Sequence, residues 1–191
     1  MSKYFYYDSE TLKGVGILNE QASYISYPYC MISDELALSV YDSSLSTYRA
    51  EYLSYSNGVV VYNFEFYRWQ KQKEFNGIFK STDCIIINND TCIDLDNSDN
   101  VDLQKVHCDN QVEATNSTKI KAKNSADNLA KFYTLTNKAD MQTLINNILC
   151  ARAQYITLKE ENQIKIDQAT SQDDLSAIDL TNINLDFLDL R

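Results

Sequence analysis

A run of apolar residues near the C-terminus, repeating at helical spacing, constrains the fold more than any other feature. Its members follow one another in steps of 3, 4, 3, 4 and 3 residues: Met141, Leu144, Ile148, Ala151, Tyr155 and Leu158. This spacing places them on one face of an α-helix. We expect the helix to begin near Thr136 or Asn137 and to reach Gln168, a length of about 45 Å at about 1.5 Å per residue. Such a face predicts packing on a sheet or pairing with a second copy of the chain.

The long helix is expected to stop without Gly or Pro and to be followed by a shorter one. Thr170 or Ser171 can cap a new helix, and Asp173 and Asp174 then lie in its first turn, where carboxylates are favoured. Side-chain capping competes with continuation of the preceding helix. The tail from residue 180 to 191 carries apolar residues among Asp and Asn, so we expect it to pack against the rest of the chain.

The N-terminal part is predicted to be a set of short antiparallel strands, because the sequence contains 14 Tyr but 4 Gly and 1 Pro and tyrosine suits half-buried sheet faces. We expect strands at residues 3–7, 14–18 and 24–29, and a short helix capped by Ser33. Asn57-Gly58 lies between two β-rich runs and predicts a tight hairpin, since both residues accept positive φ.

The middle part alternates between strand and ambiguous patterns. Val60, Tyr62, Phe64 and Phe66 share one face of a predicted strand, and residues 67–77 fit either a helix or a continuation of that strand. Further strands are expected at 78–87, 91–95, 118–122 and 131–135. The predicted fold class is therefore α+β, with a β-rich part at 1–67, a mixed part at 68–135 and a helical part at 136–191.

The charge and the distribution of apolar residues argue against nucleic-acid binding and against a membrane span. With 27 acidic against 17 basic residues, the net charge is -10, and no basic stripe that could neutralise phosphates is present, so no nucleic acid is expected as a partner. No run of eighteen apolar residues occurs, so no membrane span is expected. The N-terminus lacks the pattern of an export signal, and free thiols are therefore expected for the five cysteines.

Two groups of residues partly match the patterns of metal sites. His107 and Cys108 with Cys84 and Cys92 could supply zinc ligands, but their spacing matches no zinc finger or ribbon. Residues 94–102 contain four Asp and resemble the start of a calcium loop, but Gly is missing at the sixth position and Glu at the twelfth. We expect buried thiols and a solvated acidic loop instead, with no metal and no cofactor.

No arrangement of residues predicts an enzyme. His107 is the single histidine, and its neighbour Cys108 would point to the opposite face of a strand. No glycine-rich phosphate loop is present. In a chain this acidic, paired carboxylates carry little information. We therefore expect no catalytic residues.

Two stretches resemble a domain of uncharacterised function found in tailed-phage proteins associated with tail fibres or their assembly. The first is RWQKQKEFNGI at residues 68–78. The second combines the strand FYTLT at 132–136, the long helix, and IDQATSQDDLSAI at 166–178. The N-terminal KYFYYDSETLKG and the later ISDEL are also similar to the opening of tail-fibre assembly chaperones. The Trp-Pro ending that is common in those chaperones is absent.

The resemblance spans about residues 65–179 and implies a phage-tail setting. Together with the absence of catalytic groups and the tyrosine content, it predicts a non-enzymatic tail-fibre or baseplate protein, located in the virion tail or in the host cytoplasm during assembly. Tail-fibre or baseplate proteins are then the expected partners, with self-association through the long helix. The alternatives are an acidic inhibitor of a host defence protein and a component of a bacterial contractile secretion apparatus. Six residues are expected to form the partner interface: Tyr24, Tyr27, Tyr29, Leu144, Ile148 and Tyr155.

Overall fold

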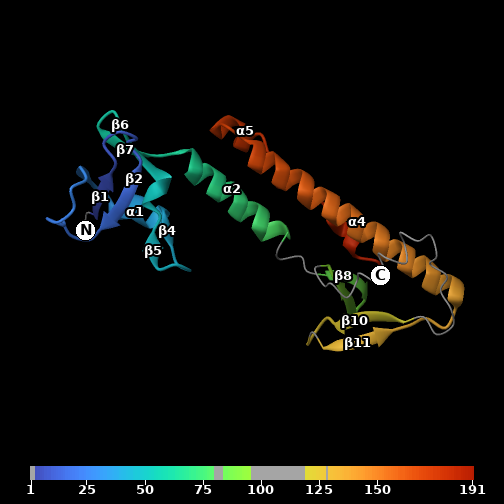
Figure 1. Cartoon of the computed structure of the whole chain (residues 1–191). Coiled ribbons are helices and arrows are strands. Elements are labelled where there is room, and N and C mark those ends of the chain that lie inside the picture. The colour runs from blue at the N-terminus through green and yellow to red at the C-terminus, as the bar shows by residue number, and fades with distance from the viewer. Residues whose placement is uncertain (1–2, 80–83, 96–118, 128) are drawn as a thin grey trace. The chain divides into compact units, whose positions relative to one another are not determined.

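The protein is described by a computed structural model, which places residues 3–79, 84–95, 119–127 and 129–191 (Figure 1). The predicted α+β class is confirmed: antiparallel sheets fill the N-terminal half, and a long helix followed by a short one lies near the C-terminus. Among the described residues, no helix has the length and the apolar character needed to cross a membrane.

Contacts divide the chain into two compact units, each made of two segments. The first unit comprises Met1–Lys73 and Gln168–Ile178, and the second comprises Glu74–Asp167 and Asp179–Arg191. The division into three consecutive parts, 1–67, 68–135 and 136–191, stays a prediction.

A three-stranded antiparallel sheet forms the N-terminal end of the first unit. Its strands are β1 (Lys3–Tyr7), β2 (Gly14–Leu18) and β3 (Tyr29–Ile32), in the order β2-β1-β3. The predicted strand at 24–29 was wrong, because the chain pairs with β1 only from Tyr29 onward. The preceding residues instead connect β2 to β3, two strands that lie on opposite sides of β1.

Local capping and turn chemistry explain the next elements. Helix α1 (Asp34–Ser39) begins where the Ser33 side chain accepts a hydrogen bond from the Leu36 N–H at 3.1 Å, as predicted. The short strands β4 (Tyr41–Asp42) and β5 (Thr47–Tyr48) follow, and then the 3-10 helix η1 (Ala50–Tyr52).

The hairpin predicted at Asn57-Gly58 is confirmed. Strands β6 (Leu53–Ser56) and β7 (Val59–Tyr62) pair directly across it. Asn57 has φ 50° and Gly58 has φ 88°, the positive values that a two-residue turn of this kind requires.

The strand predicted through Phe66 ends as β7 at Tyr62, and helix α2 (Phe64–Phe79) takes the place of its last residues. The Asn63 side chain accepts hydrogen bonds from the Glu65 N–H at 3.1 Å and the Phe66 N–H at 3.4 Å. This cap ends β7 and begins the helix. The same helix continues through Phe79, so the strand expected at 78–87 is shorter and becomes β8 (Cys84–Asn88).

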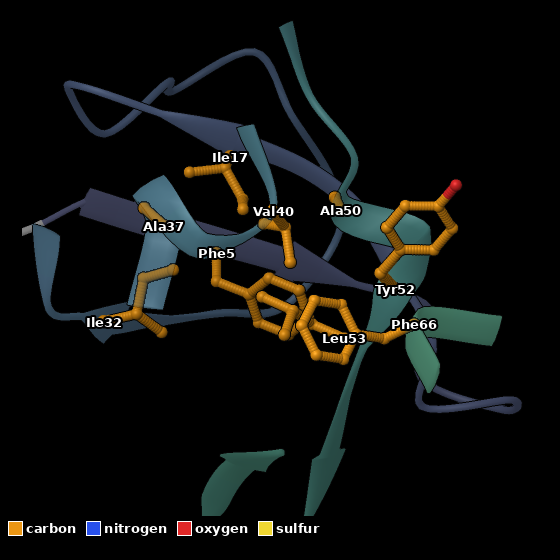
Figure 2. Close-up of a cluster of buried hydrophobic side chains, with 9 residues drawn as sticks. All are labelled: Phe5, Ile17, Ile32, Ala37, Val40, Ala50, Tyr52, Leu53 and Phe66. Atoms are coloured by element: carbon orange, nitrogen blue, oxygen red, sulfur yellow. The ribbon is translucent and has the colours of Figure 1, made fainter. Parts of the chain in front are cut away.

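The core of the first unit lies between the sheet, α1, η1 and the start of α2, and Figure 2 shows its side chains. Phe5 is fully buried, and Phe66 reaches the same cluster from α2. Gly14 is required on β2, because a Cβ atom there would lie 2.1 Å from the Ala50 carbonyl oxygen. The sequence thus permits η1 to approach the sheet closely at this one position. Nine residues form the cluster: Phe5, Ile17, Ile32, Ala37, Val40, Ala50, Tyr52, Leu53 and Phe66.

The second unit contains a four-stranded antiparallel sheet in the order β11-β10-β9-β8. The other strands are β9 (Thr91–Asp94), β10 (Ile120–Asn124) and β11 (Ala130–Tyr133). The strands predicted at 91–95, 118–122 and 131–135 therefore exist, each shifted by no more than two residues. Ile85, Ile93 and Ile120 are almost fully buried on this sheet.

The long helix α4 (Lys138–Gln168) confirms the main prediction from the sequence. It is the long orange helix of Figure 1. Its buried face consists of Met141, Ile145, Ile148, Leu149, Ala151, Tyr155, Asn162 and Ile166. Most residues of the predicted apolar stripe are therefore buried in the core of the second unit.

A complete capping box starts the short helix α5 (Gln172–Ser176). The Ser171 hydroxyl accepts from the Asp174 N–H at 3.1 Å, and the Asp174 carboxylate accepts from the Ser171 N–H at 2.9 Å. Within the first unit, the Arg68 guanidinium donates to the Ala169 carbonyl at 2.9 Å and thereby binds one of the last free carbonyls after α4. The break between the helices is therefore produced by side-chain capping, as the sequence suggested.

The C-terminal tail packs against the second unit, as expected. Leu180 and Leu188 are buried, and Leu188 ends the 3-10 helix η3 (Asp186–Leu188). The Leu190 N–H donates to the Ile86 carbonyl at 2.9 Å, which attaches the tail to strand β8.

Candidate functional site

The outer face of the β2-β1-β3 sheet is aromatic. Side chains alternate across a strand, so Phe5 points into the core while Tyr4 and Tyr6 point outward. The register pairs Tyr4 with Met31 and Tyr6 with Tyr29. The Tyr29 ring lies 5.7 Å from the Tyr4 ring and 5.6 Å from the Tyr6 ring. Three tyrosines thus form one contiguous group on the side of the sheet that faces away from the core.

The β2–β3 connection must pass β1, because the two strands it joins lie on opposite sides of β1. It does so on this outer face, where Ala22 meets the Tyr6 hydroxyl. The Tyr6 hydroxyl accepts a hydrogen bond from the Ala22 N–H at 2.7 Å. The Tyr7 N–H donates to the Pro28 carbonyl at 3.0 Å. These two bonds hold the connection against β1, and Tyr6 is left 1% exposed beneath it.

The remaining large side chains of this region reach solvent. Tyr24 is 85% exposed, Tyr27 46%, Tyr29 44% and Met31 65%. We call these four residues, with Tyr4, the aromatic face. Exposed tyrosine and methionine are typical of protein interfaces, where the ring buries apolar area and the hydroxyl keeps a hydrogen bond.

The three N-terminal residues of the predicted interface, Tyr24, Tyr27 and Tyr29, are all exposed, and their role in binding stays a prediction. Tyr24 and Tyr27 lie in the crossing connection rather than on a strand, and Tyr29 opens β3. Tyr4 and Met31 were missed. The pairing of β1 with β3 places them beside Tyr29, and the periodicity of the sequence contains no signal for that pairing.

The three helical residues of the predicted interface have different surroundings. Ile148 is 1% exposed and Tyr155 is 2% exposed, while Leu144 is half-buried. The Tyr155 hydroxyl donates to the Phe79 carbonyl at 2.5 Å, and the two rings lie 5.8 Å apart. Ile148 and Tyr155 therefore belong to the core of the second unit. Among the described residues of α4, Ile164 is the exposed large apolar side chain.

The described part of the chain offers few candidates for a metal site or a reactive thiol. No group of three or more His, Cys, Asp or Glu residues that could hold a metal ion occurs among the described residues. His107, Cys108 and most of the acidic loop at 94–102 lie outside those residues. Burial raises the pKa of the Cys30 thiol, which disfavours the reactive thiolate form. Cys92 and Cys150 are also free thiols.

Comparison of the sequence with models of protein families finds no match, and neither does comparison with curated proteins or with solved structures.

Proposed function

We propose that the chain is a non-enzymatic protein-binding component of a phage tail, acting at the tail fibre or baseplate or during its assembly. The observation that supports binding is the aromatic face, on which Tyr24 is 85% exposed and Met31 65%. The sequence resemblance over residues 65–179 supports the phage-tail setting.

The partner surface expected for this face is apolar, with carbonyl or carboxylate acceptors at its edge. Rings supply most of the buried area in such an interface, and each tyrosine hydroxyl donates one hydrogen bond to the rim. The hydrogen bonds at Tyr6 and Tyr7 keep the crossing connection in place before binding, which reduces the entropy lost on association.

The first experiment is quantitative mass spectrometry of purified particles from the source, followed by a pull-down from infected cells. We expect either several copies of the chain per particle or co-purification with fibre or baseplate proteins from the cell. Absence from the particle together with the absence of any tail protein from the pull-down would contradict the proposal.

The surface itself is tested with Tyr24→Ser and Tyr27→Ser combined, since both side chains are exposed and the change should leave the fold intact. Leu38→Ser with Leu45→Ser is the matched control, because these residues are 60% and 61% exposed elsewhere on the first unit. We expect the tyrosine pair, and not the leucine pair, to lose the partner. The binding should persist at high salt, whereas binding by an acidic inhibitor with net charge -10 should weaken steeply.

A further inference from the structure

A second feature, independent of the aromatic face, is a pocket of about 550 Å³ in the second unit. One wall is a single face of α4, where Gln154, Leu158, Glu161, Asn162 and Lys165 recur at helical spacing. The opposite wall is the tail between residues 179 and 187. This volume falls in the range of small-molecule sites, which is about 300 to 1,000 Å³.

Hydrogen bonds within the tail fix the shape of the tail wall. The Asp179 carboxylate accepts hydrogen bonds from the Thr181 N–H at 2.9 Å, the Thr181 hydroxyl at 2.7 Å and the Asn182 amide at 2.6 Å. These bonds lower the pKa of Asp179 and close a turn. Leu180 and Leu188 are buried at either end of the wall. Each wall of the pocket is therefore fixed by contacts of its own: α4 by its buried face, and the tail by these hydrogen bonds and the two buried leucines.

Asn162 is the buried polar residue of the pocket, with 5% exposure. Its amide nitrogen donates to the Leu158 carbonyl at 2.8 Å, within the helix. Its Oδ1 atom has no hydrogen bond to any described residue, and it is not among the fully enclosed atoms that lack a partner. This oxygen is therefore available to accept a hydrogen bond from a ligand in the pocket.

Other side chains around the pocket also have amide atoms with no hydrogen-bond partner among the described residues. The Gln154 amide makes no hydrogen bond to another described side chain. Asn182 uses its nitrogen on Asp179 and keeps its oxygen free, while Asn184 uses its oxygen on the Asp186 N–H at 2.6 Å and keeps its nitrogen free. The pocket therefore offers amide donors and acceptors side by side. A sugar hydroxyl, which both donates and accepts, matches such a set.

The charges and apolar residues narrow the ligand class further. The lining has two carboxylates, Glu161 and Asp179, against one ammonium, Lys165, so it lacks the clustered cations that phosphate binding needs. Asp179 is already occupied by its three donors. Ile183 and Phe187 are half-buried and offer apolar surface to the C–H face of a sugar ring.

We propose that this pocket binds a neutral saccharide of one to three sugar rings. Asn162 Oδ1 accepts from a hydroxyl at the floor, Gln154, Asn182 and Asn184 bind further hydroxyls at the rim, and the apolar residues contact the ring. Neither the aromatic face nor the phage-tail setting is needed for this argument.

The test is an amide-shift titration of the full chain by NMR with lactose, maltotriose and di-N-acetylchitobiose separately, each at about 10 mM, ten times a Kd of about 1 mM. We expect at least one sugar to shift the amides of residues 154–165 and 179–187 and leave the sheet of the second unit unchanged. Loss of one hydrogen bond to the ligand in Asn162→Leu should weaken binding about tenfold.

Asn147→Leu is the matched control, since it makes the same change on an exposed residue of the same helix outside the pocket. It should bind the sugar like the unchanged chain. Gln154→Ala, at an exposed position, replaces Asn162→Leu if the latter does not fold, and should also weaken binding. The proposal is overturned if no sugar causes shifts, if the pocket and control variants bind equally, or if the neutral peptide Ala-Ala-Ala shifts these amides and the sugars do not.

Discussion

The hydroxyl of Tyr6 makes one of the two hydrogen bonds that hold the crossing connection against β1, and its removal tests how the aromatic face is organised. Tyr6→Phe deletes the acceptor of the Ala22 N–H, which lies 2.7 Å away, and keeps the ring that is 1% exposed. The change therefore removes one hydrogen bond and creates no cavity. Tyr6→Ala removes the same bond and the ring as well.

The two variants should differ widely in stability. Ala22 is half-buried, so water can partly replace the lost acceptor, and Tyr6→Phe should cost about 1 kcal/mol. That corresponds to roughly a fivefold increase in opening of the connection. Tyr6→Ala should cost about 3 to 5 kcal/mol, because it leaves a cavity under the connection.

Two measurements check this reasoning. Hydrogen exchange should show the Ala22 amide exchanging about fivefold faster in Tyr6→Phe. Denaturant unfolding can be followed by the fluorescence of Trp69, the single tryptophan, whose ring stacks on Tyr52 at 5.4 Å in the first unit. Unchanged exchange at Ala22, or an equal loss of stability in both variants, would refute the role assigned to the hydroxyl.

Three further predictions concern glycine, capping and pH. Gly14→Ala should destabilise the first unit by about 1 to 3 kcal/mol or more, while Gly16→Ala, with no atom within 4 Å of its added Cβ, should be nearly neutral by Trp fluorescence. Ser171→Ala should cost about 1 kcal/mol through loss of the cap, and hydrogen exchange should show faster opening of α5. The hydrogen bond from Arg191 lowers the pKa of Asp189 from 3.8 to about 2. The stabilisation is therefore present above pH 3.8 and lost as the pH falls toward 2. A carboxyl NMR titration should show a higher pKa of Asp189 in Arg191→Ala, although the backbone N–H of residue 191 still donates to this carboxylate; an unchanged low value would contradict the assignment.

Elements that depend on local interactions could be predicted from the sequence. The stripe in α4, the Ser171 cap and the Asn57-Gly58 turn each involve residues within a few positions of one another. The start of α2 was missed because two local signals compete there. Alternation at residues 60–66 fits a strand, but the Asn63 cap, which also lies in the sequence, outweighs it.

The candidate surfaces were only partly predictable. The composition indicated tyrosine-rich contacts, and Tyr24, Tyr27 and Tyr29 lie close together along the chain; their role in binding a partner stays a prediction. Their partners Tyr4 and Met31 come from register between strands more than twenty residues apart along the chain. The pocket at Asn162 could not be found from periodicity, because its second wall is the tail.

The sequence by itself determined the long helix α4, the caps at Ser33 and Ser171 and the tight hairpin, since these follow from helical periodicity and from side chains and backbone groups within about four residues. Only the tertiary structure decided the strand order β2-β1-β3, the crossing of the connection over Tyr6, and the return of the tail beside α4. These arrangements depend on burial and hydrogen bonds between residues far apart in the chain, where many pairings satisfy the same local pattern and packing of the whole core selects among them.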